Sequence, residues 1–283
     1  MKTVILCGGQ GTRLREKTES IPKPLVEVGP YPIVWHLMKS YSAQNLSEFV
    51  LCLGYKGQLI KDYFLGAMDD RAGDFRLSAV GNGPPVLESL RSQREPWDVI
   101  FAETGLSTDT GGRVHKIRDY VDNSTFCLTY ADGVSDIDIK ALLDFHKSHG
   151  KVATVTAVRR QTALGVMRLN DADSVTNFAE KPMLEYYING GFFVFEPEIF
   201  DYTSDNCNLE TDVLPQLVEE GQLMAYKHEG FWACMDTYKD NITLTELWNS
   251  GNAPWRVAET APSVKANAPE IEHSSPKVAD AVS

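Results

Sequence analysis

The chain has 283 residues and a formal net charge of −12, and 43% of its residues are hydrophobic and 10% aromatic. This length allows one large domain or two small ones, and the apolar content is sufficient for a substantial core. A protein that binds nucleic acid normally presents a basic face to the phosphates, and no such cluster occurs here, so we exclude nucleic acid as a partner. A few well-placed cations and a metal ion would have to attract an anionic ligand, because the overall charge repels it.

Membrane and secretion signals are not expected either. No apolar run approaches the roughly eighteen residues that a membrane-spanning helix needs. Met1 and Lys2 lead directly into a short strand followed by glycines, which is not a signal-peptide pattern. The five cysteines show no zinc-type spacing, so we interpret them as structural thiols of a reducing compartment. We therefore expect a cytoplasmic protein with no membrane partner.

Short apolar strands alternate with helical patterns in the first half of the chain. The expected strands are 3–7, 49–54, 97–103 and 125–130. The expected helices are 33–44, 57–64, 112–121 and 138–149. This alternation predicts an α/β fold with a Rossmann-like, mostly parallel sheet flanked by helices. Ligand sites in such sheets lie at the carboxyl ends of the strands.

The second half is richer in strands. These are expected at 151–158, 165–169, 174–180 and 187–195, with helices at 209–221 and 238–251. We interpret them as a mixed sheet with a small antiparallel, sugar-binding lobe that covers the site. Residues 258–283 contain no aromatic residue and no periodic pattern, so they cannot bury enough apolar surface to fold. We expect one domain over 1–257 and a disordered tail over 258–283.

The glycine-rich loop "CGGQGTRL" (7–14) directly follows the first strand. Glycines let the backbone approach a phosphate closely and offer N–H groups to its oxygens. The loop matches neither the dinucleotide fingerprint nor the P-loop. A glycine turn after a strand is by itself weak evidence for a ligand site.

Two cations near this loop strengthen the case. Arg13 offers a guanidinium that can grip phosphate oxygens at two points. Lys23 is held between Pro22 and Pro24, and each proline restricts its own φ and the residue before it. Solvated surface charges would explain neither the prolines nor the proximity to the glycines. We therefore expect a triphosphate here.

Two aspartates are candidate metal ligands. Asp132 follows the strand "FCLTY" and precedes a glycine, a position suited to a hard cation. It could instead cap the next helix, but Ser135 and Asp136 are at least as well placed for that cap. Asp236 precedes the last helix, and the sequence alone equally allows it to be an N-cap.

A possible acceptor pocket is indicated by "EKP" (180–182) and "NGG" (189–191). Glu180 can accept hydrogen bonds from sugar hydroxyls, Lys181 can pair with a phosphate, and Asn189 can both donate and accept. The glycines leave space for a ligand beside a strand. A hairpin with a surface Glu–Lys pair is an equally simple interpretation of these residues.

Taken together, these motifs resemble the sugar-1-phosphate nucleotidyltransferases over residues 1 to about 257. "GGQGTRL", "IPKPLVEVG", the loop Asp followed by Gly, "MDT" and the E-K-P/N-G-G pair carry the resemblance. "TGGRVHKI" and "HEGFWACMDT" are similar to the glucose-1-phosphate cytidylyltransferase branch of that family.

The resemblance implies roles for individual residues. The nucleotide would contact Leu6, Gly8, Gly9, Gly11, Thr12, Arg13, Lys23, Thr104, Gly111 and Arg113. The sugar phosphate would contact Tyr130, Glu180, Lys181, Asn189 and Gly190. Arg13, Lys23 and Asp132 would be catalytic, and Asp132 with Asp236 would bind Mg²⁺. A homo-oligomer whose substrates are CTP and α-D-glucose 1-phosphate is also implied.

The charges of such a reaction explain the need for a metal ion. A phosphate dianion facing one charge on the α-phosphoryl group at about 5 Å meets about 6–7 kcal/mol of repulsion at an effective dielectric near 20. Lys23 alone would offset about half of this, and a divalent ion the rest. Two alternatives remain open: the same chemistry on another base or sugar, and a non-catalytic regulator that binds nucleotide sugars.

Overall fold

The computed structural model describes residues 1–11, 14, 18–68, 75–78, 86–89 and 95–257. The expectations for Thr12, Arg13 and the tail 258–283 lie outside these residues.

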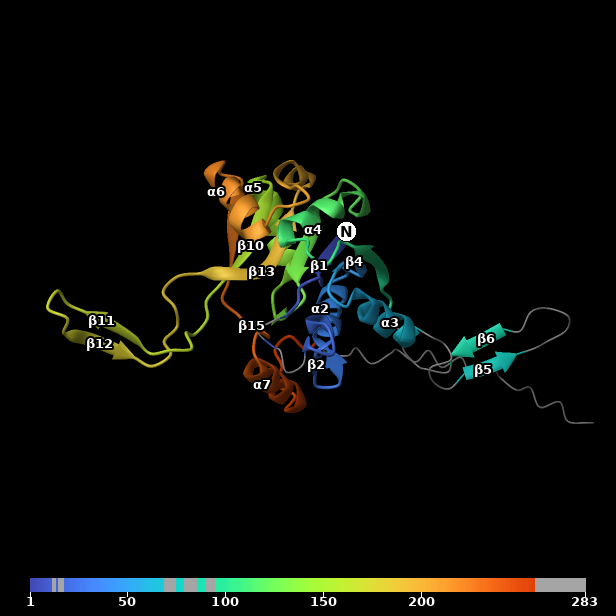
Figure 1. Ribbon diagram of the computed structural model, residues 1–283, viewed down its shortest axis with the longest axis horizontal. Coiled ribbons are helices and arrows are strands. Elements are labelled where there is room, and N and C mark those ends of the chain that lie inside the picture. Colours follow the sequence, from blue (N-terminus) through green and yellow to red (C-terminus); the bar gives the residue numbers. More distant parts are fainter. Residues whose placement is uncertain (12–13, 15–17, 69–74, 79–85, 90–94, 258–283) are drawn as a thin grey trace, which may run out of the picture.

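A seven-stranded sheet forms the centre of the described part of the molecule, in the order β14-β10-β13-β8-β1-β4-β7 (Figure 1). Its strands are β1 (Lys2–Leu6), β4 (Glu48–Leu53), β7 (Asp98–Glu103), β8 (Phe126–Tyr130), β10 (Ala153–Val158), β13 (Ile188–Phe195) and β14 (Leu223–His228). β13 runs antiparallel to both of its neighbours, and the other pairings are parallel. The prediction of a mixed, mostly parallel sheet is confirmed.

Both faces of this sheet are covered, which explains why its central strands are continuous apolar runs. Val4 and Leu6 of β1 point into one buried cluster, and Ile5 points into another on the opposite face. The helices are α2 (Ile33–Ser42), α3 (Gly57–Met68), α4 (Thr110–Lys116), α5 (Ile139–His149), α6 (Leu214–Glu219) and α7 (Tyr238–Asn249). α4 and α6 contribute to the first cluster, and α2, α3 and α5 to the second.

Short helical turns complete the chain between these elements. They are the 3₁₀ turns Lys23–Leu25, Arg118–Tyr120 and Pro197–Tyr202 and the π turn Leu209–Val213. The helix expected over 112–121 is therefore α4 followed by a 3₁₀ turn, and the helix expected over 209–221 begins with the π turn.

Four two-stranded antiparallel sheets surround the described part of the central sheet. They are β2 (Glu27–Val28) with β3 (Tyr31–Pro32), β5 (Phe75–Ser78) with β6 (Val86–Ser89), β9 (Gly133–Ser135) with β15 (Trp232–Cys234), and β11 (Val166–Leu169) with β12 (Val175–Ala179). None of the described helices is long and apolar enough to cross a lipid bilayer.

The β11–β12 hairpin was expected to cover the site. It instead projects from the body of the molecule as an arm, which we define as residues 159–187 (Figure 1). Every residue from 166 to 178 is exposed. The two strands and an antiparallel lobe were expected from the sequence, which contains no information on where the hairpin points.

Candidate active site

Lys23, Asp132 and Asp236 converge at the carboxyl end of β8. The Lys23 Nζ atom donates to Asp132 Oδ2 at 2.7 Å and to Asp236 Oδ1 at 2.9 Å. The lysine side chain is 13% exposed and each carboxylate 26%. The juxtaposition expected from the sequence is thus present, with one ammonium between two carboxylates.

The β9–β15 ladder brings the two aspartates together. Asp132 lies in the turn between β8 and β9, and Gly133 of β9 pairs with Cys234 of β15. The Met235 N–H then donates to the Asp132 carbonyl oxygen at 2.8 Å, which sets Asp236 beside Asp132.

A buried cluster brings the lysine segment to the same place. Met235 packs in one cluster with Val26 and Val28, which follow the turn carrying Lys23. Apolar contacts between these two segments, which are far apart in the sequence, therefore align the ammonium with the carboxylates.

Neither aspartate caps a helix. Asp138 caps α5 by accepting from the Ala141 N–H at 2.9 Å, so the cap lies later than the expected Ser135 or Asp136. Thr237 and Asp240 form a capping box at the start of α7. The alternative that Asp236 is an N-cap is therefore excluded, and both carboxylates face the site.

The electrostatics of this group keep the lysine charged. Burial alone would lower the pKa of Lys23, but the charges and hydrogen bonds of Asp132 and Asp236 outweigh burial and raise it. Burial, with the two carboxylates adding to it, raises the pKa of the Cys234 thiol well above its usual range.

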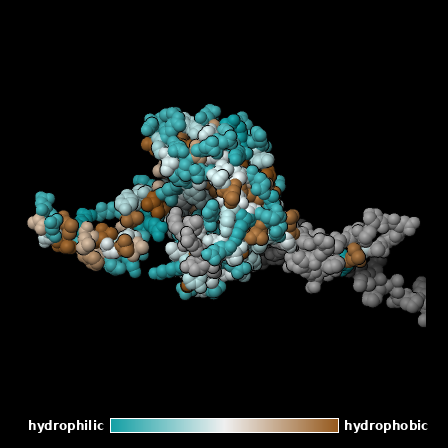
Figure 2. Space-filling model, viewed as in Figure 1, coloured by the Kyte–Doolittle hydropathy of each residue, from teal (hydrophilic) through white to brown (hydrophobic). Residues whose placement is uncertain are grey.

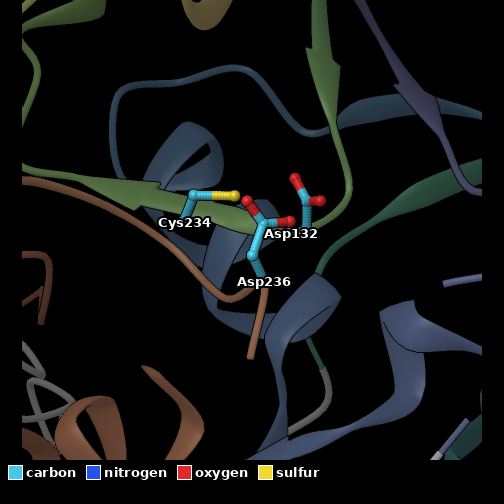
Figure 3. Close-up of side chains that lie close together, drawn as sticks. All are labelled: Asp132, Cys234 and Asp236. Carbon is cyan, nitrogen blue, oxygen red and sulfur yellow. The ribbon is translucent and has the colours of Figure 1, made fainter. Parts of the chain in front are cut away.

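Figure 3 shows the side chains of Asp132, Cys234 and Asp236 directed toward one another. One ligand atom from each lies within 4.8 Å of the others. Two carboxylates that share one cation suit a hard divalent ion such as Mg²⁺. The thiol is a softer ligand, of the kind that zinc prefers.

A cavity of about 390 Å³ opens beside the aspartates over the carboxyl ends of β1 and β8. Its lining residues are Leu6, Cys7, Gly8, Gly9, Gly11, Lys23, Pro24, Thr108, Asp109, Thr110, Arg113, Tyr130, Ala131, Asp132 and Asp236. Glycine backbone therefore forms one wall and the lysine–aspartate group another. We call this the first cavity.

Arg113 supports the glycine loop from beneath. It is 4% exposed, and its guanidinium donates to Leu53 O at 3.0 Å, to Thr104 Oγ1 at 2.6 Å and to Gly8 O at 3.2 Å. A Cβ atom at Gly8 would overlap the guanidinium, so the close approach requires glycine. Burial lowers the pKa of Arg113, but an arginine stays charged at neutral pH, so a buried positive charge lies under the loop.

Two residues expected to contact the nucleotide do not line this cavity. The Thr104 hydroxyl is buried, donates to Leu53 O and accepts from Arg113. Thr104 therefore supports Arg113 without lining the cavity. Gly111 packs so closely on Cys207 that a Cβ atom would meet its sulfur at 2.5 Å. The polar residues Thr108–Thr110, which were not among the expected contacts, line the cavity instead. Their signal was the polar stretch between β7 and the two glycines in the first turn of α4.

A second cavity, of about 440 Å³, adjoins the first. It is lined by Thr129, Tyr130, Asp132, Gly133, Arg160, Ile188, Asn189, Gly190, Gly191, Glu210, Trp232, Cys234 and Asp236. Tyr130, Asp132 and Asp236 line both cavities. Two ligands bound side by side would therefore meet over the two carboxylates.

The second cavity has a preorganised polar wall. Glu210, in the π turn, accepts from the Tyr130 hydroxyl and, at 2.5 Å, from Thr110 Oγ1. Asn189 donates to the Tyr130 oxygen at 3.3 Å. Gly191 has φ +77°, and a Cβ atom there would meet the Tyr130 ring at 2.5 Å. Tyr130 and Asn189 were expected in this pocket but Glu210 was not, because only the fold brings the π turn to β8.

Glu180 and Lys181 lie on the arm and are absent from the lining of both cavities. Their side chains are 63% and 54% exposed, and the Lys181 Nζ is 3.9 Å from a Glu180 oxygen. Of the expected acceptor residues, the fold thus brings together Tyr130, Asn189 and Gly190 and leaves these two outside.

Comparison with known proteins agrees with this geometry. The nucleotidyl transferase family model matches residues 2–246. The glucose-1-phosphate cytidylyltransferase of Salmonella typhimurium is 44% identical over 262 residues, which are 92% of this chain and 100% of that protein. The mannose-1-phosphate guanyltransferase of Schizosaccharomyces pombe is 29% identical, over 88% of this chain and 65% of that protein.

A solved structure shares the fold. The crystal structure of HddC from Yersinia pseudotuberculosis superimposes with a TM-score of 0.63 at 22% identity, covering 87% of this chain and 99% of that one. With the family match over most of its length, the chain belongs to the nucleotidyl transferase family.

Proposed function

We propose that this enzyme transfers the cytidylyl group of CTP to α-D-glucose 1-phosphate, forming CDP-glucose and pyrophosphate. The observation that carries the proposal is the meeting of two cavities over Lys23, Asp132 and Asp236. The choice of substrates is supported by the relative at 44% identity, a glucose-1-phosphate cytidylyltransferase, against 29% for the guanyltransferase.

In this proposal the triphosphate occupies the first cavity. The backbone of Gly8, Gly9 and Gly11 faces its phosphates, and the buried guanidinium of Arg113 adds positive charge beneath them. Arg13 and Thr12 belong to the same loop and are assigned to the triphosphate by the sequence motif alone.

The sugar 1-phosphate occupies the second cavity. Tyr130, Asn189 and Gly190 line it and offer donors and acceptors to sugar hydroxyls. An oxygen of the sugar phosphate attacks the α-phosphorus of CTP while the bond to the bridging oxygen of the β-phosphate breaks. The electron pair of that bond leaves with pyrophosphate, and no general base is needed because the attacking oxygen is already ionised.

The protein's contribution is positioning and charge neutralisation. Lys23 lines the first cavity and holds its ammonium against Asp132 and Asp236, which line both cavities and where the two phosphates must approach. Mg²⁺ held by Asp132 and Asp236 would supply further positive charge to the phosphoryl oxygens. Asp132 is thus assigned a catalytic role through its position beside both Lys23 and the metal.

A substrate panel tests the proposal. CTP, UTP, GTP, ATP and dTTP are each combined with glucose 1-phosphate or mannose 1-phosphate, and pyrophosphate release is measured. We expect the highest kcat/KM with CTP and glucose 1-phosphate. Faster turnover of another pair would replace the substrates and keep the chemistry, whereas nucleotide binding with no pyrophosphate from any pair would favour a regulator.

A further inference from the structure

A buried amide lies behind the candidate active site. Asparagine side chains usually lie at the surface, and the face of the body seen in Figure 2 is largely hydrophilic. Asn241 of α7 is instead 3% exposed, and it is the only asparagine or glutamine among the buried residues that the structure describes. Burying a polar group costs free energy unless the group is hydrogen-bonded. The hydrogen bonds of this amide therefore show which parts of the molecule it holds.

The amide joins the segment that carries Lys23 to the segment that carries Asp236. Its Nδ2 atom donates to the Glu27 carbonyl oxygen at 2.7 Å and to Met235 Sδ at 3.4 Å. Glu27 follows Lys23 by four residues, and Met235 immediately precedes Asp236. A carboxamide nitrogen carries two N–H donors, so both contacts can form at once. One side chain thus bridges the ammonium segment and the carboxylate segment.

The residue before Asn241 holds the other side of the same ion pair. Asp240 Oδ2 accepts from the Asp236 N–H at 3.1 Å and from the Thr237 N–H at 2.7 Å. The Lys23 ammonium in turn donates to Asp236 at 2.9 Å. Two consecutive residues of α7 therefore hold the backbone on both sides of the Lys23–Asp236 pair.

Backbone pairing does not fix the lysine segment against Asp236. The strand β2, which follows the Lys23 turn, pairs only with β3 among the described strands and belongs to a separate sheet. The helix α7 packs against β2, and apolar side chains of both lie in one buried cluster (Figure 1). Apolar contacts are non-directional, so they bring the segments together without fixing their relative position. A directional hydrogen bond from a buried amide supplies that constraint.

The short segment between Glu27 and Lys23 transmits the constraint. The Val26 N–H donates to Lys23 O at 3.0 Å and closes the 3₁₀ turn, and the Ile33 N–H donates to Val26 O at 3.0 Å. Val26 is fully buried. A displacement of Glu27 would therefore move the Lys23 backbone with it.

We propose that Asn241 is a positioning residue for the transfer reaction. Its amide sets the distance between the Lys23 ammonium and Asp236, and thereby the place of the positive charge that the reacting phosphates meet. Asn241 lines neither cavity, so it acts through Lys23 and does not contact a substrate. This inference rests on the proposed function of Lys23.

A double-mutant cycle tests whether Asn241 acts through Lys23. Asn241→Leu replaces the amide by an apolar side chain of similar volume, and CTP binding measured by calorimetry verifies that the variant is folded. We expect kcat to fall at least ~10-fold in the wild-type background, because a small misplacement of a catalytic group is costly. In the Lys23→Met background the same substitution should change kcat less than about twofold, since no ammonium is left to misplace.

Matched variants complete this experiment. Asn241→Ala, which removes the amide without filling its space, is carried through the same cycle and decides the question if the leucine variant does not bind CTP. Asn249→Leu removes an exposed carboxamide from the last turn of α7 and should keep kcat within about twofold in both backgrounds. An equal fall in kcat in both backgrounds, or an unchanged kcat in the wild-type background, overturns the proposal.

A crystal structure of Asn241→Leu provides a measurement that does not depend on the reaction. The distance from Lys23 Nζ to Asp236 Oδ1 is 2.9 Å with the amide present and should lengthen beyond the ~4 Å limit of an ion pair without it. An unchanged distance overturns the inference whatever the substrates are. If the distance lengthens while the wild type releases no pyrophosphate from any substrate pair, Asn241 positions Lys23 as inferred and the proposed function fails.

Discussion

The Nζ atom of Lys23 lies 2.7 Å from a carboxylate oxygen of Asp132, although 109 residues separate the two in the sequence. The same nitrogen reaches Asp236, 213 residues away, at 2.9 Å. One ammonium is therefore shared by two carboxylates at the place where the two cavities join.

Removing the ammonium should slow the reaction. Lys23→Met keeps the length of the side chain but leaves the approaching phosphates without one neutralising charge, so kcat should fall at least ~100-fold. Pyrophosphate release under saturating substrates measures the change. The control is Lys39→Met, which removes a partly buried lysine paired with Glu95 away from the site and should change kcat less than about twofold. Equal rates in Lys23→Met and wild type would refute the catalytic role.

The same variant should make stability depend on magnesium. Without Lys23, the repulsion between Asp132 and Asp236 should cost about 2 kcal/mol in metal-free buffer. Adding Mg²⁺ should therefore raise Tm more in Lys23→Met than in wild type, as measured by calorimetry with and without a chelator. Identical magnesium responses would argue against a metal at these carboxylates.

Loss of one metal ligand should lower the affinity of the site for Mg²⁺. In Asp236→Asn, the magnesium concentration for half-maximal turnover should rise by about tenfold or more, because the site loses one anionic ligand. Chelation should abolish turnover of the wild type. The exposed Asp144 on α5 provides the control, and Asp144→Asn should leave the magnesium titration unchanged.

The glycine loop offers a comparison between adjacent positions. Gly8→Ala places a Cβ atom into the Arg113 guanidinium and should destabilise the protein by about 1–3 kcal/mol through overpacking. Apart from its chain neighbours, no heavy atom of the described residues lies within 4 Å of a Cβ atom at Gly9, so Gly9→Ala should stay within about 0.5 kcal/mol of wild type. Urea unfolding measures both. Similar losses in both variants would show that Arg113 does not support the loop as described.

Lowering the pH should decrease the stability of the folded protein, because His36 is protonated more readily in the unfolded chain. Burial lowers the pKa of His36 from 6.5 to about 4, while its ring nitrogen donates to Val28 O at 2.8 Å. Between pH 4 and pH 6.5 the unfolded chain therefore binds more protons at His36 than the folded protein does. The free energy of unfolding consequently decreases as the pH falls from 6.5 toward 4. At pH 5 this loss should be about 2 kcal/mol.

The His36→Gln variant isolates this contribution. Its difference in unfolding free energy between pH 7.5 and pH 5.0 should be smaller than that of wild type by about 2 kcal/mol, whatever its absolute stability. His115→Gln keeps His36 and should retain the wild-type difference. A His36→Gln profile parallel to wild type would exclude His36 as the source of acid sensitivity.

The sequence alone determined the short motifs from which the site is built. A buried strand followed by glycines, a lysine between prolines and an aspartate at a strand end each depend on a few neighbouring residues, so their spacing was sufficient to predict them. The sheet class followed from the alternation of strands and helices. The family resemblance then linked these segments to one chemistry, which the comparisons support.

Only the tertiary structure decided which segments meet. Thr104 and Gly111 were expected to contact the nucleotide but do not line the first cavity, while Glu210 enters the second cavity from a distant π turn. Glu180 and Lys181 lie outside both cavities, on the arm that projects from the body (Figure 1). Spacing along the chain sets the direction of a side chain within its own element, whereas contacts between elements depend on sheet order and core packing, which arise from the whole chain at once.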